Sequence, residues 1–277
     1  MLILLIGFIA GFVGALLGIG GGVIIVPSLS LFLGIPIHSA IAISIFAVAA
    51  TGMAGAARYI KQGLTDIKLG IYLETMTVLG VALGVHLALL ATPEFLYLVF
   101  SILLYYLALT HLFTVKKEET KLLEDGFEDA EKEMGLSGSY YDKALGKEVR
   151  YSVKGAIRGS LLSFFAGIGS GLLGIGGGVF KVAAMNLLMN VPLKVSVATS
   201  KFMIGITAGT GALLYMLSGS TPLLSLAPAA MGTIIGATLG SKIMNRIRSR
   251  YLKYILFLLM MYLGINMMLK GLAFLGW

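Results

Sequence analysis

The sequence contains no cysteine and has little charge for its length. The absence of cysteine excludes disulfides, thiolate catalysis and cysteine-ligated metal sites. Only 12% of the 277 residues are charged, roughly half of what the surface of a soluble domain requires. Apolar residues make up 58% of the chain. This composition predicts an all-α, polytopic protein that crosses the cell (plasma) membrane several times.

Acidic residues are scarce outside one segment, because ten of the thirteen Asp and Glu lie between positions 116 and 156. We interpret 116–156 as a charged cytoplasmic connector. Its last part predicts a β-hairpin that turns near Leu145 and Gly146. A charged stretch of this kind is typical of a solvated tether, and a regulatory or docking element is the alternative.

The net charge of +8 does not indicate a nucleic-acid partner. No stripe of Lys and Arg alternates with aromatic residues on a polar face. Most basic residues outside the connector stand at helix ends instead, where anionic lipid headgroups attract them. The expected partners are therefore the lipid bilayer and a small anionic substrate.

Glycine is abundant, and its densest cluster occurs twice. The string "LLGIGGGV" spans 16–23 and returns at 172–179, an offset of 156 residues. The same offset places Pro36 on Pro192, which predicts transmembrane repeats at 1–115 and 157–277. The expected helical segments are 2–17, 23–33, 39–60, 70–91 and 95–114, followed by 157–173, 179–189, 195–216, 222–244 and 251–270.

The second segment of each repeat is too short to cross a bilayer, which takes about 20 residues. We therefore expect each repeat to combine a broken, re-entrant helix hairpin with three transmembrane helices. The basic loop follows the third segment in repeat one and the fourth segment in repeat two. Since basic loops stay on the cytoplasmic side, this exchange predicts two inverted repeats with both termini outside.

The doubled glycine turn is the main candidate site. Non-helical backbone is tolerated at membrane depth only where protein or a water-filled cavity satisfies it. The half-helix after each turn begins with free N–H groups and a positive dipole end, which attract anions. The predicted substrate-binding glycines are Gly20, Gly21, Gly22, Gly176, Gly177 and Gly178. Close helix packing is the alternative use of such glycines.

Two lysines lie deep in the second repeat, where charge is costly. Lys181 and Lys201 replace Ile25 and Ile45 of the first repeat, so they make one side of a pseudo-symmetric cavity positive. The alternative is that their side chains extend to the surface.

Hydroxyl groups accompany the lysines on the same helices. Those of Ser44, Thr199 and Ser200 are predicted to orient the substrate, unless they bond back to their own helix. Thr51 and Thr207 lie two turns further along and could line the path.

Glu74 is the predicted coupling residue, because it is the acid best placed to enter a helix. It could carry a proton or pair with a lysine. Its position four residues from the basic loop favours an interfacial carboxylate instead.

The strings "GALLGIGGGVIIVP" and "GLLGIGGGVFKVA" resemble the sulfite exporter TauE/SafE family, also called the 4-toluenesulfonate uptake permease family. The resemblance covers nearly the whole chain apart from the connector. It implies a secondary transporter of sulfur-containing anions, with the doubled glycines at the substrate centre. The second motif departs from the first, because Ala183 replaces Pro27.

The sequence therefore predicts an exporter of sulfite or organosulfonates that binds its substrate near the membrane midplane. The alternative is a transporter or channel for another small anion, such as a carboxylate or an inorganic anion. We do not expect an enzyme, since no Asp lies in a predicted helix and no His is deep enough to serve a nucleophile. No cofactor or metal site is expected. Without an ATPase signature, an ion gradient has to drive transport. The anion, the direction, the coupling ion and the oligomeric state, a homo-oligomer included, are left open.

Overall fold

The computed structural model describes residues 1–17, 20–113, 136–142, 146–219, 221–243 and 249–274. The helices of the first repeat are α1 (Leu2–Leu17), α2 (Gly22–Phe32), α3 (Ile37–Lys61), α4 (Ile67–Leu90) and α5 (Pro93–Phe113). Those of the second are α6 (Ala156–Leu173), α7 (Gly178–Ala183) with the π-helical turn η3 (Ala184–Leu188), α8 (Leu193–Leu217), α9 (Leu223–Ile243) and α10 (Ser249–Phe274). With α7 and η3 taken together, the structure has a helical segment at each predicted place, with boundaries within four residues of those expected.

Helices account for most of the described chain, because a segment in lipid has to satisfy its own N–H and C=O groups. Within the part of the chain that the structure describes, six helices are long and apolar enough to cross a membrane. They are Ile37–Lys61, Ile67–Leu90, Ala156–Leu173, Leu193–Leu217, Leu223–Ser241 and Phe257–Phe274. The fold is therefore an all-α polytopic membrane protein.

The second repeat begins with a helix hairpin that returns to its starting end. The N–H of Lys154, just before α6, donates a 3.2 Å hydrogen bond to the carbonyl of Met189, just after η3. The helical segment Gly178–Leu188 is too short to cross a bilayer by itself. This is the re-entrant geometry that the sequence predicts.

The two half-helices differ beyond their first turns. α2 stays α-helical through Pro27, whereas α7 widens into η3 directly after Ala183, the equivalent residue. Asn190 then takes a left-handed conformation, with φ 56°, and ends the segment. The prediction of one regular helix at 179–189 is wrong here, because a π-helical turn of this kind depends on tertiary packing.

The first helix of each repeat packs on the other repeat. α1 lies along α9, and α6 lies along α4. Glycines make both contacts close: a β-carbon at Gly84 or at Gly240 would overlap the backbone of Ile168 or of Phe12. Each is the second glycine of a GxxxG pair, Gly80 with Gly84 on α4 and Gly236 with Gly240 on α9. Small residues of this kind let membrane helices approach each other.

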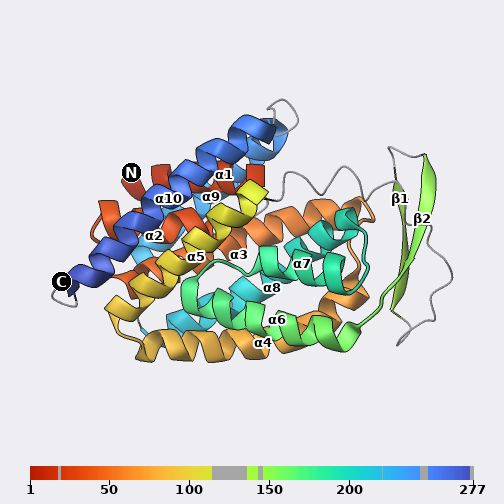
Figure 1. The fold of residues 1–277 in the computed structure, drawn as a ribbon, viewed down its shortest axis with the longest axis horizontal. Coiled ribbons are helices and arrows are strands. Elements are labelled where there is room, and N and C mark those ends of the chain that lie inside the picture. Colours follow the sequence, from red (N-terminus) through yellow and green to blue (C-terminus); the bar gives the residue numbers. More distant parts are fainter. Residues whose placement is uncertain (18–19, 114–135, 143–145, 220, 244–248, 275–277) are drawn as a thin grey trace.

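Equivalent helices α3 and α8 run antiparallel along each other at the centre (Figure 1). Gly52 on α3 lies against Gly205 on α8, and Gly55 lies against Lys201. Further along, Gly211 lies against Ile45. Residues nearer the start of α3 thus contact residues nearer the end of α8. Two oppositely oriented halves would place these equivalent helices in this antiparallel arrangement.

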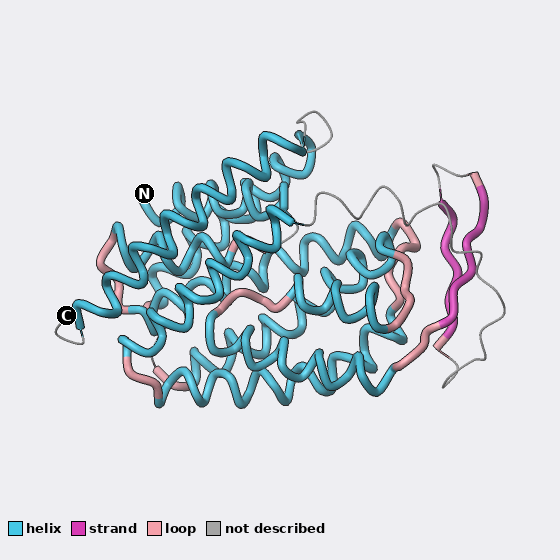
Figure 2. Tube along the Cα trace, in the orientation of Figure 1, coloured by secondary structure: helices cyan, strands magenta, loops and turns pink. Residues whose placement is uncertain are grey.

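The predicted β-hairpin of the connector is present. It consists of β1 (Ser137–Asp142) and β2 (Lys147–Ser152), which pair antiparallel. It lies at one end of the helices, whereas the start of α1 and the end of α10 lie toward the other end (Figures 1 and 2). The polar stretch at 116–135, predicted before it, lies outside the described residues, and the boundaries of the connector stay a prediction.

The hairpin covers the start of α4. The Tyr151 hydroxyl donates to Oδ2 of Asp66 at 2.7 Å, and Oδ1 of Asp66 caps α4 by accepting from the N–H of Leu69 at 3.0 Å. Tyr140 and Tyr151 share one apolar cluster with Leu69 and Leu73. Burial and the bond to Asp66 raise the pKa of the Tyr151 phenol above its usual value, so the hydroxyl remains a donor.

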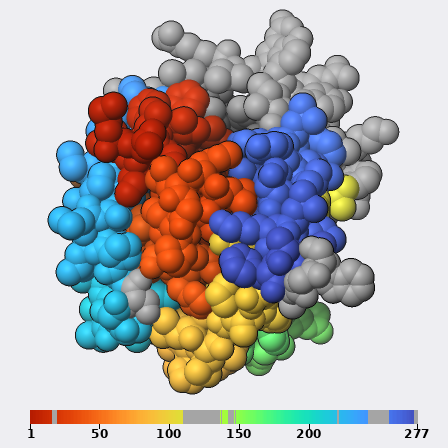
Figure 3. Space-filling model, turned by 90° about the vertical axis from the view of Figure 1, so that its left-hand side faces the viewer, coloured from red at the N-terminus to blue at the C-terminus, as the bar shows by residue number. Residues whose placement is uncertain are grey.

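At the opposite end of the molecule, other helices surround α2. Seen from that end in Figure 3, α2 and the chain leading into α3 lie at the centre. α1, α9, α10 and the junction of α4 with α5 surround them. The central apolar core includes the completely buried Ile41, Ile45 and Val48 of α3. Residues 22–30 of α2 are buried, whereas Phe32 at its end is exposed, so the start of α2 lies within the protein, where its backbone can be satisfied without lipid contact.

Candidate functional site

The two glycine turns meet in the interior. Gly21 and Gly177 precede α2 and α7 with φ of 78° and 66°, which only glycine adopts at low cost. A β-carbon at Gly22 would lie 2.5 Å from the Gly174 carbonyl oxygen, so the turns touch across the repeats. Beside this contact, a recess of about 10 Å3 lies between the second turn and Val23 at the start of α2, roughly the space of one water molecule. It is lined by Val23, Leu107, Ile175, Gly177, Gly178, Val179 and Phe180.

The predicted glycines are therefore brought together at one place. Gly21, Gly22, Gly176, Gly177 and Gly178 are buried, and Gly20 is half-buried. The first N–H groups of each half-helix point back toward its turn, as at every helix start. Each half-helix start thus directs N–H donors at the junction, where they can face an anion.

Serine hydroxyls hold both turns at equivalent positions. Ser44 donates to the Gly22 carbonyl at 3.5 Å and to the Gly174 carbonyl at 2.8 Å. Ser200 donates to the Gly178 carbonyl at 3.2 Å. Both side chains are buried. They lie at the turns as predicted, and in this conformation their hydroxyl hydrogens are directed to protein carbonyls.

Thr199 has a different position from Ser44 and Ser200. Its hydroxyl accepts a 3.0 Å hydrogen bond from the N–H of Asp66, at the start of α4. The structure thus connects Thr199 to the helix end beneath the β-hairpin and not to the glycine turns.

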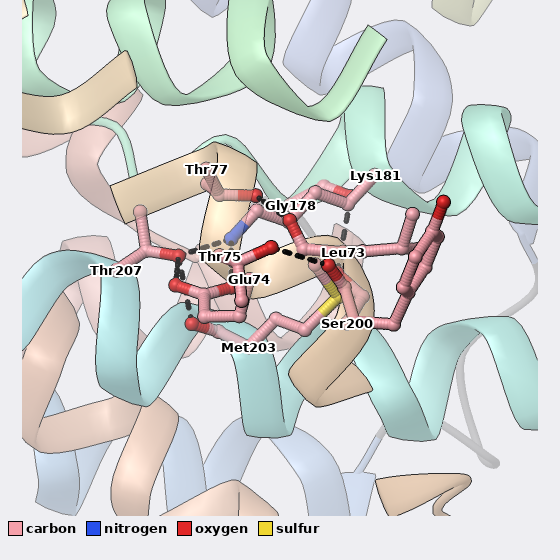
Figure 4. A network of polar contacts seen from close by, with 10 residues as sticks. Leu73, Glu74, Thr75, Thr77, Gly178, Lys181, Ser200, Met203 and Thr207 are labelled. Carbon is pink, nitrogen blue, oxygen red and sulfur yellow. Dashed lines mark hydrogen bonds and ion pairs between the residues drawn. The ribbon is translucent and has the colours of Figure 1, made fainter. Parts of the chain in front are cut away.

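Lys181 is fully buried and forms an ion pair with Glu74. Its Nζ lies 3.3 Å from Oε2 of Glu74, and both groups also contact the Thr207 hydroxyl (Figure 4). The Glu74 side chain is 5% exposed. The three residues come from α7, α4 and α8, so the cluster joins the second half-helix to helices of both repeats.

The preference for an interfacial Glu74 is wrong. Leu69 and Leu73 are completely buried, and Glu74 lies on the same buried face of α4, whereas Ile67 and Ile71 are exposed. A sequence places a residue by its distance from a loop, and it carries no sign that another segment folds over that loop. The alternative, pairing with a lysine, is what the structure contains.

Lys201 is half-buried and packs its stem against Gly55 of α3. With the described part of the chain it forms no hydrogen bond or ion pair. It lies on the contact between α3 and α8. Lys181 has the opposite situation, because it lies near the turn and its charge is already balanced by Glu74.

The chain is similar to known membrane proteins over most of its length. The family model described as sulfite exporter TauE/SafE matches residues 3–267. The chain belongs to this family of membrane transporters. It is 29% identical over 278 residues to the probable membrane transporter protein YunE of Bacillus subtilis (strain 168), covering 98% of each chain. It is 26% identical over 261 residues to the probable membrane transporter protein YdhB of the same organism, covering 93% of this chain and 96% of the relative. No solved structure matches the chain.

Membership of this transporter family gives the buried polar groups a context. Intramembrane charges and broken helices in transporters commonly surround the transported solute or ion. In the described ranges, no group of three His, Asp or Glu side chains could hold a metal ion. The chemistry that these residues offer is anion binding by N–H groups and proton exchange at a carboxylate.

Proposed function

We propose that the protein is a secondary transporter that exports small sulfur-containing anions, such as sulfite or organosulfonates. The anion would bind between the two glycine-rich half-helix ends near the middle of the bilayer. The observation that carries this proposal is the contact between the two turns inside the protein, where a β-carbon at Gly22 would lie 2.5 Å from the Gly174 carbonyl oxygen. Membership of the TauE/SafE family favours a sulfur oxyanion.

The chemistry of the junction suits an anion. Free N–H groups from two helix starts converge there with two positive dipole ends. Ser44 and Ser200 can turn their hydroxyl hydrogens from the carbonyls of Gly174 and Gly178 toward a bound oxyanion. Lys181 lies one turn along α7, and Lys201 adds positive charge on α8. Glu74 is the proposed coupling residue.

Transport requires the junction to open. The recess holds little more than one water, and a sulfur oxyanion is larger, so the two halves have to move apart to admit it. We infer that the repeats are inverted across the membrane and rock against each other around the fixed site. The antiparallel contact of α3 with α8 supports this.

The test is the thermal unfolding midpoint of the purified protein in detergent against a panel of solutes. The panel contains sulfite, thiosulfate, sulfoacetate, taurine, lactate and chloride. A ligand at a hundred times its dissociation constant stabilises by about 2.7 kcal/mol. We expect a saturable rise with at least one sulfur anion, reduced in Lys201→Ala and retained in Lys61→Ala, an exposed lysine at the end of α3. A response to lactate or chloride alone indicates another anion, and no response to any solute contradicts the proposal.

A further inference from the structure

The Glu74, Lys181 and Thr207 cluster is built on one side of the pseudo-symmetric site only. The offset of 156 residues places Ala230, Ile25 and Thr51 at the equivalent positions. Ala230 and Ile25 are apolar and buried, and Thr51 donates its hydroxyl to the Val48 carbonyl of its own helix. Both repeats thus supply a glycine turn, but only the second half-helix has an ion pair behind it. This asymmetry indicates a task that anion binding alone does not require.

The cluster is connected to the second glycine turn through α7. The N–H of Lys181 donates to the Gly177 carbonyl at 3.2 Å in the first turn of α7. Gly178, three residues before Lys181, accepts from Ser200 of α8. Lys181 and the proposed anion-binding end of α7 therefore lie within one helical turn of each other.

As long as Glu74 is ionised, its negative charge neutralises the positive charge of Lys181. An anion approaching the turn then meets a neutral pair, and taking Lys181 from Glu74 would leave a buried carboxylate without a partner, which is strongly unfavourable. A protonated Glu74 needs no cation. Its protonation leaves Lys181 with an unbalanced positive charge one turn from the site, where an anion can neutralise it.

Thr207 is suited to position the exchange. Its oxygen accepts from Lys181, and its one hydrogen can go to Oε1 of Glu74 or to the Met203 carbonyl, 2.8 Å away (Figure 4). When Glu74 becomes neutral, the hydroxyl hydrogen can turn to Met203 and leave the oxygen for Lys181. The cluster thus has two satisfied arrangements, one for each protonation state of Glu74.

No other ionisable group competes for this role on the helices around Glu74. On α6 the ionisable residue is Arg158, exposed in the first turn, and on α7 it is Lys181. On α8, Lys194 is exposed near the start, Lys201 packs on Gly55, and Tyr215 donates to the Gly171 carbonyl at 2.9 Å. Glu74 and Lys181 therefore face each other alone within the described chain.

We propose that the transported anion and Glu74 share Lys181, so that one proton binds to Glu74 for each anion that binds at the glycine turns. The proton comes from water on the side where the anion enters and leaves to water on the other side after the anion has gone. No bond to the anion forms or breaks. The proposal rests on the anion transport proposed above and assigns its coupling ion. Because proton and anion cross in the same direction, export in this scheme is driven by the gradient of the anion itself.

The test measures the dissociation constant of thiosulfate as a function of pH in the detergent-purified protein, repeated with sulfoacetate. Both probes keep their charge near neutral pH, so any proton taken up on binding belongs to the protein. We expect the affinity to fall about tenfold per pH unit above the pH at which Glu74 ionises, because one proton is linked to one anion. Binding that is independent of pH overturns the coupling and leaves the proposed function standing. Absence of binding to any panel anion contradicts the proposed function itself.

Variants assign the proton. Glu74→Gln mimics the protonated state, so its thiosulfate affinity should be independent of pH, and thiosulfate exchange between vesicles should persist without a pH-gradient response. Glu74→Asp should restore the pH dependence. Thr207→Val should shift the pH profile, whereas the matched Thr51→Val should not. If Glu74→Gln is folded by size-exclusion chromatography and retains the wild-type pH profile, another group carries the proton and the proposal is wrong. If Glu74→Gln does not fold, the pH profiles of Glu74→Asp, Thr207→Val and Thr51→Val test the proposal. A wild-type profile in Thr207→Val would then contradict it.

Discussion

Ser44 donates a 2.8 Å hydrogen bond to the carbonyl of Gly174, 130 positions away in the other repeat. The same hydroxyl also lies 3.5 Å from the Gly22 carbonyl of its own repeat. One buried side chain thus contacts both glycine turns, and the two halves are connected at the point where the substrate is proposed to bind.

Replacing Ser44 should therefore weaken the junction. We expect Ser44→Ala to cost about 1–3 kcal/mol, because a buried carbonyl loses its donor, and to lower the thermal unfolding midpoint. Ser101→Ala is the control: Ser101 is buried and donates at 2.7 Å to Leu98 of its own helix, so its loss should cost less. Equal shifts for the two variants would show that the contact between repeats contributes nothing special.

The buried ion pair should reveal itself through a double-mutant cycle. Lys181→Met leaves Glu74 as an unpaired buried carboxylate, and breaking such a pair costs about 3–5 kcal/mol. Adding Glu74→Leu removes the unpaired charge, so the double variant should be more stable than Lys181→Met. Thermal unfolding in detergent measures the wild type, Lys181→Met, Glu74→Leu and the double variant, and a double variant less stable than Lys181→Met would contradict the pairing.

The glycine turns should tolerate no side chain. Gly177→Ala places a β-carbon 2.8 Å from the Ala166 carbonyl at φ 66°, so it combines backbone strain with a clash. Gly34→Ala has nearly the same φ, 65°, with nothing within 4 Å, and it isolates the strain, about 1 kcal/mol. We expect a much larger loss of stability in Gly177→Ala, together with loss of any anion-induced shift. Similar midpoints for both variants would exclude close packing at the turn.

The hairpin should detach at alkaline pH. The pKa of Tyr151 is raised by burial and by Asp66, so its contribution is complete below the unfolded pKa of about 10. Above that pH the unfolded phenol ionises while the docked one resists, and the stability is lost as the pH rises. The protection of β1 and β2 amides against hydrogen exchange, measured relative to their intrinsic rates at the same pH, should therefore fall above about pH 10 in the wild type.

Tyr151→Phe should exchange faster at neutral pH and lose this alkaline step, whereas Tyr141→Phe, an exposed neighbour, should behave as wild type. An alkaline step that persists in Tyr151→Phe would assign it to another group.

The absence of cysteine makes the predicted orientation simple to test. Ser139→Cys on β1 and Thr92→Cys before α5 are exposed positions on opposite sides of the predicted topology. A membrane-impermeant maleimide should label Ser139→Cys only in inside-out vesicles and Thr92→Cys only in right-side-out vesicles. The reverse pattern would place the connector outside the cell.

Much of the fold could be predicted because a segment that crosses lipid has to be apolar, long enough and hydrogen-bonded within itself, and a short stretch of sequence shows this. The helical segments, the short half-helices at 23–33 and 179–189 and the hairpin near Gly146 each follow from hydropathy, segment length and turn residues within one stretch of chain. The repeat was visible because "LLGIGGGV" occurs twice at a fixed offset. The meeting of the two glycine turns followed from that symmetry.

What the sequence by itself determined is thus the set of helices, their duplication and the residues of the glycine turns. Only the tertiary structure decided that Glu74 lies inside the protein, that it neutralises Lys181, and that Thr199 supports α4. The physical reason is that burial and pairing depend on segments far apart in the chain. α7 and α8 have to pack beside α4 before Thr207 and a lysine 107 positions away can reach Glu74.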